Sequence, residues 1–566
     1  MRARLLQSLG FVFALGLSPA VAQQSVPQAP IPDPDLSAIS VMSMWSQLVD
    51  GGAPKTLPTK NTGDMVPKME MRFVLALPPS VTPATACHDT QISITGQKSG
   101  AKVAYRGTLA GNLKTPVNGH KTYNVAICAT EMDPSAQTVS ILLNGKPAML
   151  YNGGRKRAAV QASMSGPAKF GRRTANGKGL RIAFVADTGC RGMVAGEKAR
   201  MQQDCASLPV KNDAQGKWAF PVVAQQIADS APDLVIHGGD YHYFYEEWQF
   251  DDFWRGTGIN RFEYWMFEFL NPAQPMLLES PVAFARGNHE LCKTTWFGNG
   301  FFELFGPRID PNASAAEGNA LNPCNLNRSA PPEARANVSQ TWWFDVAPHN
   351  DTSVKPFRFY MIDSGNHQTA LSNDVFAPGV QAERDKIWIT HIPPTMMLHY
   401  GGRNHYADSS VMQAVTNALG SVPGCSNLSC WPRAIFTGHQ HLYQKVELSA
   451  SSTIIPGTTA TEVHIAGHGG TAWDTGGPKP RHGARAHITR CHRWLRGQTS
   501  AIAKKERQEV FGAIDMNAQF TTASRHGFLL LDRTAGTNAT AGWDITAEWT
   551  PGDPDMSWVG KNGSCE

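Results

Sequence analysis

The stretch Gly238-Gly239-Asp240-Tyr241-His242-Tyr243, directly after the apolar run Leu234-Val235-Ile236, decides the fold of this chain. A short continuous apolar run is typical of a strand that is buried on both faces of a sheet. A carboxylate at the end of such a strand, with a glycine before it, presents an oxygen ligand to a metal at the edge of an open α/β sheet. Alone this pattern is weak evidence, and it gains weight because other apolar runs end in the same way.

Five apolar runs are followed closely by side chains that are potential metal ligands. These are 182–186 before Asp187-Thr188-Gly189, 234–236 before Gly239-Asp240, 282–285 before Gly287-Asn288-His289-Glu290, 387–389 before His391, and 434–436 before Gly438-His439-Gln440-His441. A plausible crossover helix, 218–230, lies between the first two runs. Because parallel strands bring their carboxyl ends to one edge, we expect the five loops to meet in one crevice.

The ligand types indicate a pair of metal ions. Aspartates, an asparagine carbonyl and several imidazoles form a mixed oxygen and nitrogen set, which suits iron, manganese or zinc better than calcium. Glycines stand before Asp240, Asn288 and His439, where they allow tight turns and close approach of the backbone to a ligand. One histidine of this kind is more often an ordinary core or surface residue, but five such loops in order favour a metal centre.

The five blocks, taken in this order, resemble the calcineurin-like metallophosphoesterases, and most closely their purple acid phosphatase branch. The resemblance covers about 180–443 and extends to Asp532 if the strand-like run 527–531 is included. It implies an α/β fold, the four-layer α/β/β/α sandwich of that superfamily, with a smaller N-terminal β-rich domain before it. It also implies an enzyme that hydrolyses phosphoesters with two metal ions, iron paired with iron, zinc or manganese.

The branch depends on two linked positions. Many members of the superfamily have Asp-x-His in the first block, whereas this chain has Gly189 in place of the histidine. The purple branch replaces that imidazole with the tyrosine of Gly-Asp-x-x-Tyr, and Tyr243 stands at that place. The alternative is that Tyr243 belongs to an aromatic packing cluster with its neighbours Tyr241 and Tyr245.

The resemblance also implies a role for each residue of the site. One metal would be held by Asp187, Asp240, Tyr243 and His441, and the other by Asp240, Asn288, His391 and His439. Asp240 would therefore bridge the two ions. His289 would not be a ligand, but would donate a proton to the leaving oxygen or hold the phosphate. Such a pair of cations neutralises phosphate charge and promotes in-line attack by hydroxide on a phosphomonoester.

Two other functions stay open at this point. A phosphodiesterase would use the same metal core, because substrate preference lies in the surrounding loops. A non-catalytic surface-binding protein would keep one metal for structure and use 71–149 to engage an extracellular polymer. Five polar residues near the blocks are kept outside the catalytic set, since ordinary loop polarity explains each as well: His242, Arg286, His399, His405 and His468.

The first 22 residues predict export through a cleaved signal peptide, to the periplasm or outside the cell. Arg2 and Arg4 precede a short apolar segment, and Ala20-Val21-Ala22 supplies a cleavage pattern. The apolar segment is shorter than the ~20 residues of a membrane span, so no transmembrane segment is expected in the mature chain. The net charge of +5 is too small to indicate a nucleic-acid partner, which leaves the phosphoester substrate as the expected ligand.

The ten cysteines, an even number in an exported chain, predict disulfides. Proximity in sequence suggests the pairs Cys87–Cys128, Cys190–Cys205, Cys292–Cys324, Cys425–Cys430 and Cys491–Cys565. The spacing of cysteines does not fix their connectivity, so these pairs are suggestions.

The chain divides into six predicted regions. They are a signal peptide (1–22), a Pro-rich linker with a short amphipathic helix at 36–49 (23–65), a β-sandwich-like accessory domain (66–150), a linker (151–179), the catalytic domain (180–550) and a tail (551–566). The accessory domain is predicted from four strand-like runs separated by Gly, Pro and Asn, with nothing helical between them.

Overall fold

A computed structural model describes the parts of the chain that carry its two main sheets and the loops at their edges. The described residues are 38–49, 69–95, 103–114, 120–132, 136–151, 160–165, 180–191, 203, 205, 218–243, 262–291, 298–306, 342–346, 357–365, 385–393, 397–400, 403–406, 432–448, 461–471, 519–523, 525–533, 543–550 and 558–560.

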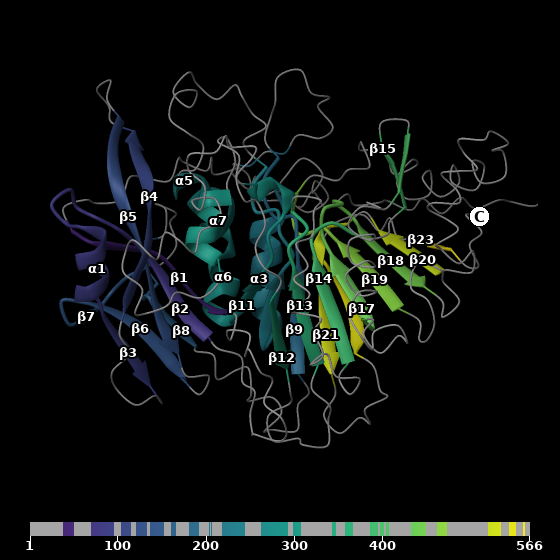
Figure 1. Cartoon of the computed structure of the whole chain (residues 1–566), viewed down its shortest axis with the longest axis horizontal. Coiled ribbons are helices and arrows are strands. Elements are labelled where there is room, and N and C mark those ends of the chain that lie inside the picture. Colours follow the sequence, from purple (N-terminus) through teal and green to yellow (C-terminus); the bar gives the residue numbers. More distant parts are fainter. Residues whose placement is uncertain are drawn as a thin grey trace, which may run out of the picture.

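Two large sheets form the centre of the molecule (Figure 1). The nine-stranded sheet has the order β22 (Asp544–Trp549), β21 (Gly527–Arg533), β9 (Leu180–Val185), β10 (Leu234–His237), β11 (Val282–Phe284), β1 (Ser40–Leu48), β2 (Met69–Ala76), β5 (His120–Met132) and β4 (Ala104–Lys114). The eight-stranded sheet has the order β12 (Trp342–Val346), β13 (Phe357–Ile362), β14 (Asp385–Thr390), β17 (Ala434–Thr437), β19 (Thr461–Ala466), β18 (Tyr443–Leu448), β20 (Gln519–Ala523) and β23 (Trp558–Gly560). Strands β9, β10 and β11 are parallel, as are β13, β14, β17 and β19.

Smaller elements surround these sheets. A four-stranded sheet contains β3 (Gln91–Thr95), β6 (Thr138–Leu143), β7 (Lys146–Pro147) and β8 (Ser163–Ser165), and a hairpin pairs β15 (Met397–Tyr400) with β16 (Arg403–Tyr406). The helices are α1 (Pro83–Asp89), α3 (Phe220–Ser230), α5 (Phe262–Tyr264), the π-helix η4 (Trp265–Leu270), α6 (Asn271–Glu279), the 3₁₀ turn η5 (Asn288–Glu290) and α7 (Gly298–Phe305).

Successive side chains along the buried strands point to opposite faces of the sheet, and they form two apolar layers. In β9, Ile182 and Phe184 point into the layer between the two sheets, where Phe184 lies 5.5 Å from the ring of Phe436 on β17. Ala183 and Val185 point the other way, into the layer under α3, η4, α6 and α7. Because successive side chains of a strand face opposite ways, an apolar strand can be covered by a sheet on one face and helices on the other. The predicted α/β fold is confirmed.

One element predicted near the N-terminus is wrong. The segment expected to form an amphipathic helix at 36–49 is the strand β1, which lies between β11 and β2. Its side chains from Val41 to Leu48 are buried on both faces, including the polar Ser43, Ser46 and Gln47. The strand therefore lacks the alternation of polar and apolar residues that distinguishes a half-buried strand from a helix. The expectation that nothing helical lies within the β-rich region is also wrong, because α1 begins after its N-cap Thr82 with Pro83 in the first turn.

The N-terminal region is β-rich, but part of it extends the central sheet. β1 pairs in parallel with β11, with Gln47 opposite Val282, and β2, β5 and β4 continue the same sheet outward. Strands from before and after the linker predicted at 151–179 therefore belong to one continuous sheet. The domain boundaries proposed from the sequence stay predictions.

Two of the suggested disulfides are present. Cys87 joins Cys128, which ties α1 to β5, and Cys190 joins Cys205 just after the first ligand-bearing loop. The other three suggested pairs lie outside the described residues, as do the signal peptide and residues 23–37 of the Pro-rich linker region.

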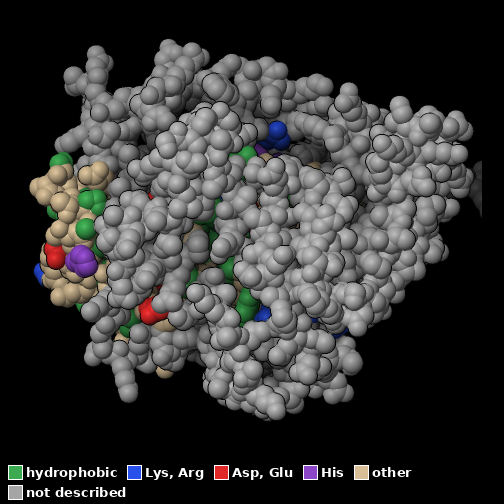
Figure 2. Space-filling model, viewed as in Figure 1, with side chains coloured by type: hydrophobic (Ala, Val, Ile, Leu, Met, Phe, Trp, Pro, Cys, Tyr) green, Lys and Arg blue, Asp and Glu red, His purple; other side chains and the backbone are tan. Residues whose placement is uncertain are grey.

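Within the described residues, no helix has both the length and the apolar character needed to span a bilayer. Figure 2 shows the surface around α1 at the left of the view, where apolar, charged and other side chains are mixed.

A buried arginine joins the N-terminal strands to the helical layer. Arg72 on β2 is fully buried, pairs with Glu70 at 2.8 Å, and donates to the carbonyls of Leu304 (2.7 Å) and Gly306 (2.8 Å) at the end of α7. These carbonyls have no partner inside the helix, so the guanidinium satisfies them. β2 thereby fixes the end of a helix that packs on η5.

Arg72→Ala should lower the free energy of unfolding by about 3–5 kcal/mol, because it removes the buried guanidinium that pairs with Glu70 and donates to two carbonyls. The matched control is Arg181→Ala, which removes a partly exposed pair with Asp532 at 2.7 Å and should cost at most about 1 kcal/mol. Urea unfolding followed by circular dichroism measures both. Equal losses in the two variants would contradict the structural role given to Arg72.

Candidate metal centre

The candidate ligands stand on loops at the carboxyl ends of five strands. Asp187 follows β9, Asp240 follows β10 and Asn288 follows β11 in one sheet, while His391 follows β14 and His439 follows β17 in the other. The crevice predicted from the sequence therefore lies between the edges of two sheets.

Three of these residues have an unusual backbone conformation. The φ angles of Asp187, Asp240 and His439 are 56°, 57° and 72°, in the left-handed region that residues other than glycine rarely adopt. Such conformations cost of order 1–3 kcal/mol each and cluster at functional sites. Their presence at three strand ends is consistent with loops that serve a ligand.

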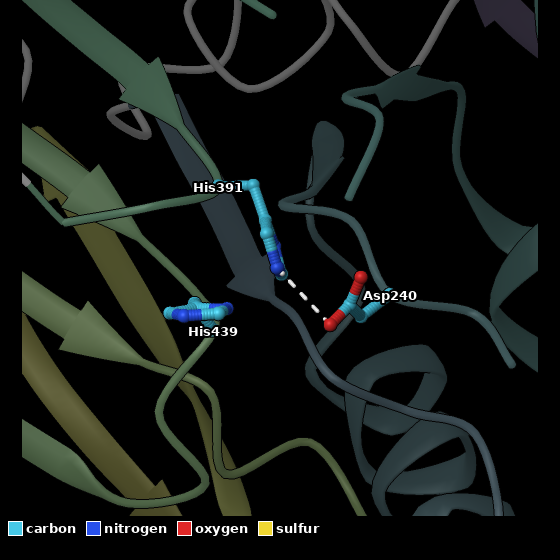
Figure 3. Close-up of side chains that lie close together, drawn as sticks. All are labelled: Asp240, His391 and His439. Atoms are coloured by element: carbon cyan, nitrogen blue, oxygen red, sulfur yellow. Dashed lines mark ion pairs between the residues drawn. The ribbon is translucent and has the colours of Figure 1, made fainter. Parts of the chain in front are cut away.

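Asp240 is the centre of the arrangement. Its Oδ2 accepts a hydrogen bond from the Tyr243 hydroxyl at 2.8 Å and lies 3.1 Å from Nε2 of His391. Its Oδ1 accepts from the backbone amide of His289 at 2.9 Å. In Figure 3 the His391 ring points at the carboxylate from the opposite sheet, with His439 beside it. One carboxylate therefore contacts side chains from both halves of the site.

A first group of donor atoms surrounds the Tyr243 hydroxyl. The hydroxyl oxygen lies 2.7 Å from Oδ1 of Asp187 and 2.8 Å from Nε2 of His441. The imidazole of His441 is also 3.6 Å from Asp187. With Asp240, these are the four residues that the resemblance assigned to one metal.

A second group surrounds the Asn288 side-chain oxygen. Nε2 of His391 lies 3.0 Å from this Oδ1, and Nδ1 of His439 lies 2.8 Å from it. Asp240, His391 and His439 each offer a ligand atom, and these atoms lie within 4.8 Å of one another. With Asn288, they are the four residues assigned to the other metal.

The two groups fit metal ions in geometry and in chemistry. Ligand atoms on an octahedral ion with bonds of about 2.1 Å are about 3 Å apart, close to the spacing found here. His391 has the support of a typical histidine ligand, because its Nδ1 donates to the carbonyl of Gly238 at 2.9 Å and leaves Nε2 facing the site.

The buried charges shift the pKa values of the metal-free site. Burial raises the pKa of Asp187 to about 6, against the attraction of His391. Burial opposes ionisation of Asp240 too, but His289 and His391 hold the pKa of that carboxyl well below its usual range. Burial opposes the charged form of His391, yet Asp240 outweighs it and raises the pKa of this imidazole to about 9. Burial and the two aspartates raise the pKa of Tyr243 well above its ordinary value.

Gly189 explains the missing imidazole of the first block. A Cβ atom at this position would lie 2.6 Å from the carbonyl oxygen of Tyr241 and 2.8 Å from Cα of His242. No side chain fits there, and the hydroxyl of Tyr243 reaches Asp187 instead. Tyr241 differs from Tyr243, since it stacks on His237 and donates to the carbonyl of Ala285.

His289 lies on the more accessible side of the site. Its side chain is 10% exposed, whereas those of His391 and Asp187 are fully buried, and Asn288 and His439 are also partly exposed. Nδ1 of His289 donates to the carbonyl of His242 at 2.8 Å, and Nε2 lies 3.8 Å from Asp240.

Two of the polar residues kept outside the catalytic set are buried in structural pairs. His242 lies 3.2 Å from Glu268, and Arg286 pairs with Asp363 at 2.9 Å. His468 is also fully buried, and the side chains of His399 and His405 lie outside the described part of the site.

Sequence reasoning missed the carboxylates that support the ligand loops. Glu290 is fully buried and accepts from the amides of Asp240 (3.1 Å), Gly287 (3.0 Å) and Tyr241 (2.9 Å). Burial and the charge of Asp240 nevertheless raise the pKa of Glu290 to about 8. The position of Glu290 directly after Asn288-His289 was the sequence signal that could have identified it. Glu268 gave no signal, because it lies outside every block in the sequence.

Residues 180–443 match the family model described as calcineurin-like phosphoesterase. The chain contains a calcineurin-like phosphoesterase domain. This match confirms the predicted superfamily for residues 180–443 and the predicted enzyme class, a metal-dependent phosphoesterase. The matched range begins at β9 and ends at the first residue of β18, so it includes all eight residues of the predicted site.

Solved structures with a similar chain path include three proteins of low sequence identity. A purple acid phosphatase, PPD1, from yellow lupin (Lupinus luteus) seeds is 12% identical, with a TM-score of 0.40 and coverage of 90% of this chain and 74% of that chain. PhoD is 11% identical, with a TM-score of 0.36 and coverage of 94% and 92%. GAP50, the anchor in the inner membrane complex of Plasmodium, is 10% identical, with a TM-score of 0.27 and coverage of 66% and 91%. No curated protein sequence matches the chain.

Metal binding by the metal-free domain should release protons at pH 7. His391 has a folded pKa of about 9, so it is protonated at pH 7, whereas a metal ligand must be neutral. The same shift stabilises the metal-free fold below about pH 6.5, and that stabilisation is lost as the pH rises through 9.

Zinc titration calorimetry in buffers of different ionisation enthalpy measures this release. We expect the zinc affinity to weaken as the pH falls. The control variant His464→Gln lies outside the site and should leave the proton release unchanged. Heats that do not depend on the buffer at pH 7 would contradict the prediction.

Proposed function

We propose that the protein is an exported phosphatase that hydrolyses phosphomonoesters with two metal ions. The observation that carries this proposal is the position of Asp240, whose carboxylate belongs to both groups of donor atoms. One ion would be held by Asp187, Asp240, Tyr243 and His441, and the other by Asp240, Asn288, His391 and His439.

The bound cations would neutralise the phosphate charge and lower the pKa of water in the site. The protein's own residues then have to admit and orient the ester. Asn288, His289 and His439 are the site residues at the accessible side, so the phosphate would approach there. The deeply buried Asp187 and His391 would keep the opposite side free of bulk water.

His289 is suited to hold the phosphate or protonate the leaving oxygen. Its backbone amide donates to Asp240, and its Nδ1 is held by the His242 carbonyl. The ring therefore has a fixed orientation, and Nε2, which lies 3.8 Å from Asp240, is the nitrogen that would meet the substrate. A fixed imidazole with a titratable nitrogen beside the reacting group is what general acid catalysis requires.

Tyr243 supports the purple acid phosphatase branch. Its hydroxyl lies among Asp187, Asp240 and His441 rather than in the aromatic cluster around Tyr241. A tyrosinate ligand favours a ferric ion, so the proposed pair is iron with iron, zinc or manganese. Purified protein with this pair should absorb visible light.

Export is proposed from the sequence of residues 1–22. The two disulfides are consistent with an oxidising compartment, the periplasm or the outside of the cell. No partner other than the phosphoester substrate is proposed.

Asp240→Asn and His439→Ala should each lower turnover of an aryl phosphate by roughly 1,000-fold or more, about 4 kcal/mol of transition-state stabilisation. The reason is that each change removes a ligand, and Asp240→Asn removes the one shared by both groups. Steady-state assays of the purified variants measure the loss.

The control is Asp233→Asn. Asp233 directly precedes β10, at the end of the strand away from Asp240, and its side chain accepts from the amide of Arg181 at 2.8 Å. An asparagine can keep that bond, so turnover should stay within about threefold of wild type. Unchanged turnover in both site variants would refute the proposal. Parallel assays on an aryl diester distinguish a monoesterase from a diesterase.

A further inference from the structure

We infer that Glu268, on the π-helix η4, is a positioning residue that sets both Tyr243 and His289 for the proposed reaction. This inference rests on the proposed function, in which Tyr243 is a metal ligand and His289 contacts the substrate. Glu268 lies 25 residues beyond Tyr243 and outside every sequence block.

The contacts of Glu268 converge on one short piece of backbone. The side chain is fully buried, and its Oε2 accepts from the amide of Tyr243 at 2.9 Å and lies 3.2 Å from Nδ1 of His242. The His242 ring is itself held edge-on against Trp265, with ring centroids 4.1 Å apart. One carboxylate oxygen therefore fixes both the main chain and a side chain at 242–243.

These contacts extend directly to the two functional residues. The carbonyl of His242 accepts from Nδ1 of His289, so the position of residue 242 sets the orientation of that ring. The ring of Tyr243 packs on the ring of His289 at 4.1 Å, and its hydroxyl reaches Asp187 and Asp240. A shift of the chain at 242–243 would move the ligand oxygen and the proposed acid together.

The π-helical turn has a reason in the sequence. Pro272 and Pro275 have no amide hydrogen for the carbonyls four residues before them, one of which is that of Glu268. The amide of Asn271 instead donates to Met266, five residues back. Such single π turns often occur at functional sites, where they change the direction of a side chain. Here the turn carries the carboxylate that contacts Tyr243 and His242.

Glu268→Ala should lower kcat for an aryl phosphate by roughly 10- to 100-fold while KM changes less than about threefold, since misplacement by about 1 Å has effects of this size. Glu268→Gln should recover most of the activity, because its amide oxygen can accept from Tyr243 and His242 as Oε2 does. The matched control is Glu462→Ala, which removes the carboxylate 3.0 Å from buried His464 on β19. It should leave kcat within about threefold of wild type.

A second measurement uses the metal-free protein. Hydrogen exchange followed by mass spectrometry should show the peptide with Tyr243 exchanging at least about tenfold faster in Glu268→Ala, with α3 unchanged. Glu268→Gln and Glu462→Ala should not show this increase.

Unchanged exchange at Tyr243, or equal loss of kcat in Glu268→Gln and Glu268→Ala, would overturn the inference. Wild-type protein without phosphatase activity would instead refute the proposed function, and the exchange experiment would still test the role of Glu268.

Discussion

The carboxylate of Asp240 is the contact on which the site depends. It accepts from a tyrosine hydroxyl and a backbone amide on its own sheet and faces an imidazole from the other sheet. Buried charges are tolerated only when they are paired or bind metals, so this carboxylate needs partners from both sheets at once. The backbone of Asp240 is left-handed, and three backbone amides around it donate hydrogen bonds to Glu290. Both features hold the Asp240 carboxylate in place.

Support for the site extends through the helical layer into the N-terminal strands. Arg72 on β2 binds the end of α7, and α7 packs on the turn that carries Asn288 and His289. Glu268 on η4 holds the chain at Tyr243 from the same layer. The proposed centre therefore lies between the eight-stranded sheet on one side and the nine-stranded sheet, with its covering helices, on the other. A rigid support of this kind keeps catalytic groups within the small tolerances that a reaction requires.

The features predicted from sequence are those that depend on local pattern. Apolar runs predicted the parallel strands and the ligand loops that follow them. Asp187 and His391 follow strands of different sheets, and they lie at one site because the carboxyl ends of both sets of parallel strands face the same crevice. β1 was misread because a strand buried on both faces has no alternation, and its apolar residues also fitted a helical spacing. Glu268 could not be predicted, since its role depends on a π-helical turn and on tertiary contact with a loop 25 residues earlier.

The central claim, that Asp240 joins two metal ions, is tested most directly by anomalous X-ray diffraction from crystals of the metal-loaded protein. We predict two anomalous peaks about 3.5–4 Å apart, one on each side of the Asp240 carboxylate. The peak nearer Tyr243 should lie beside Asp187 and His441, and the other beside Asn288, His391 and His439. A single peak bound by Asp240, His391 and His439 alone, with the Tyr243 hydroxyl still bonded to Asp187, would contradict the account.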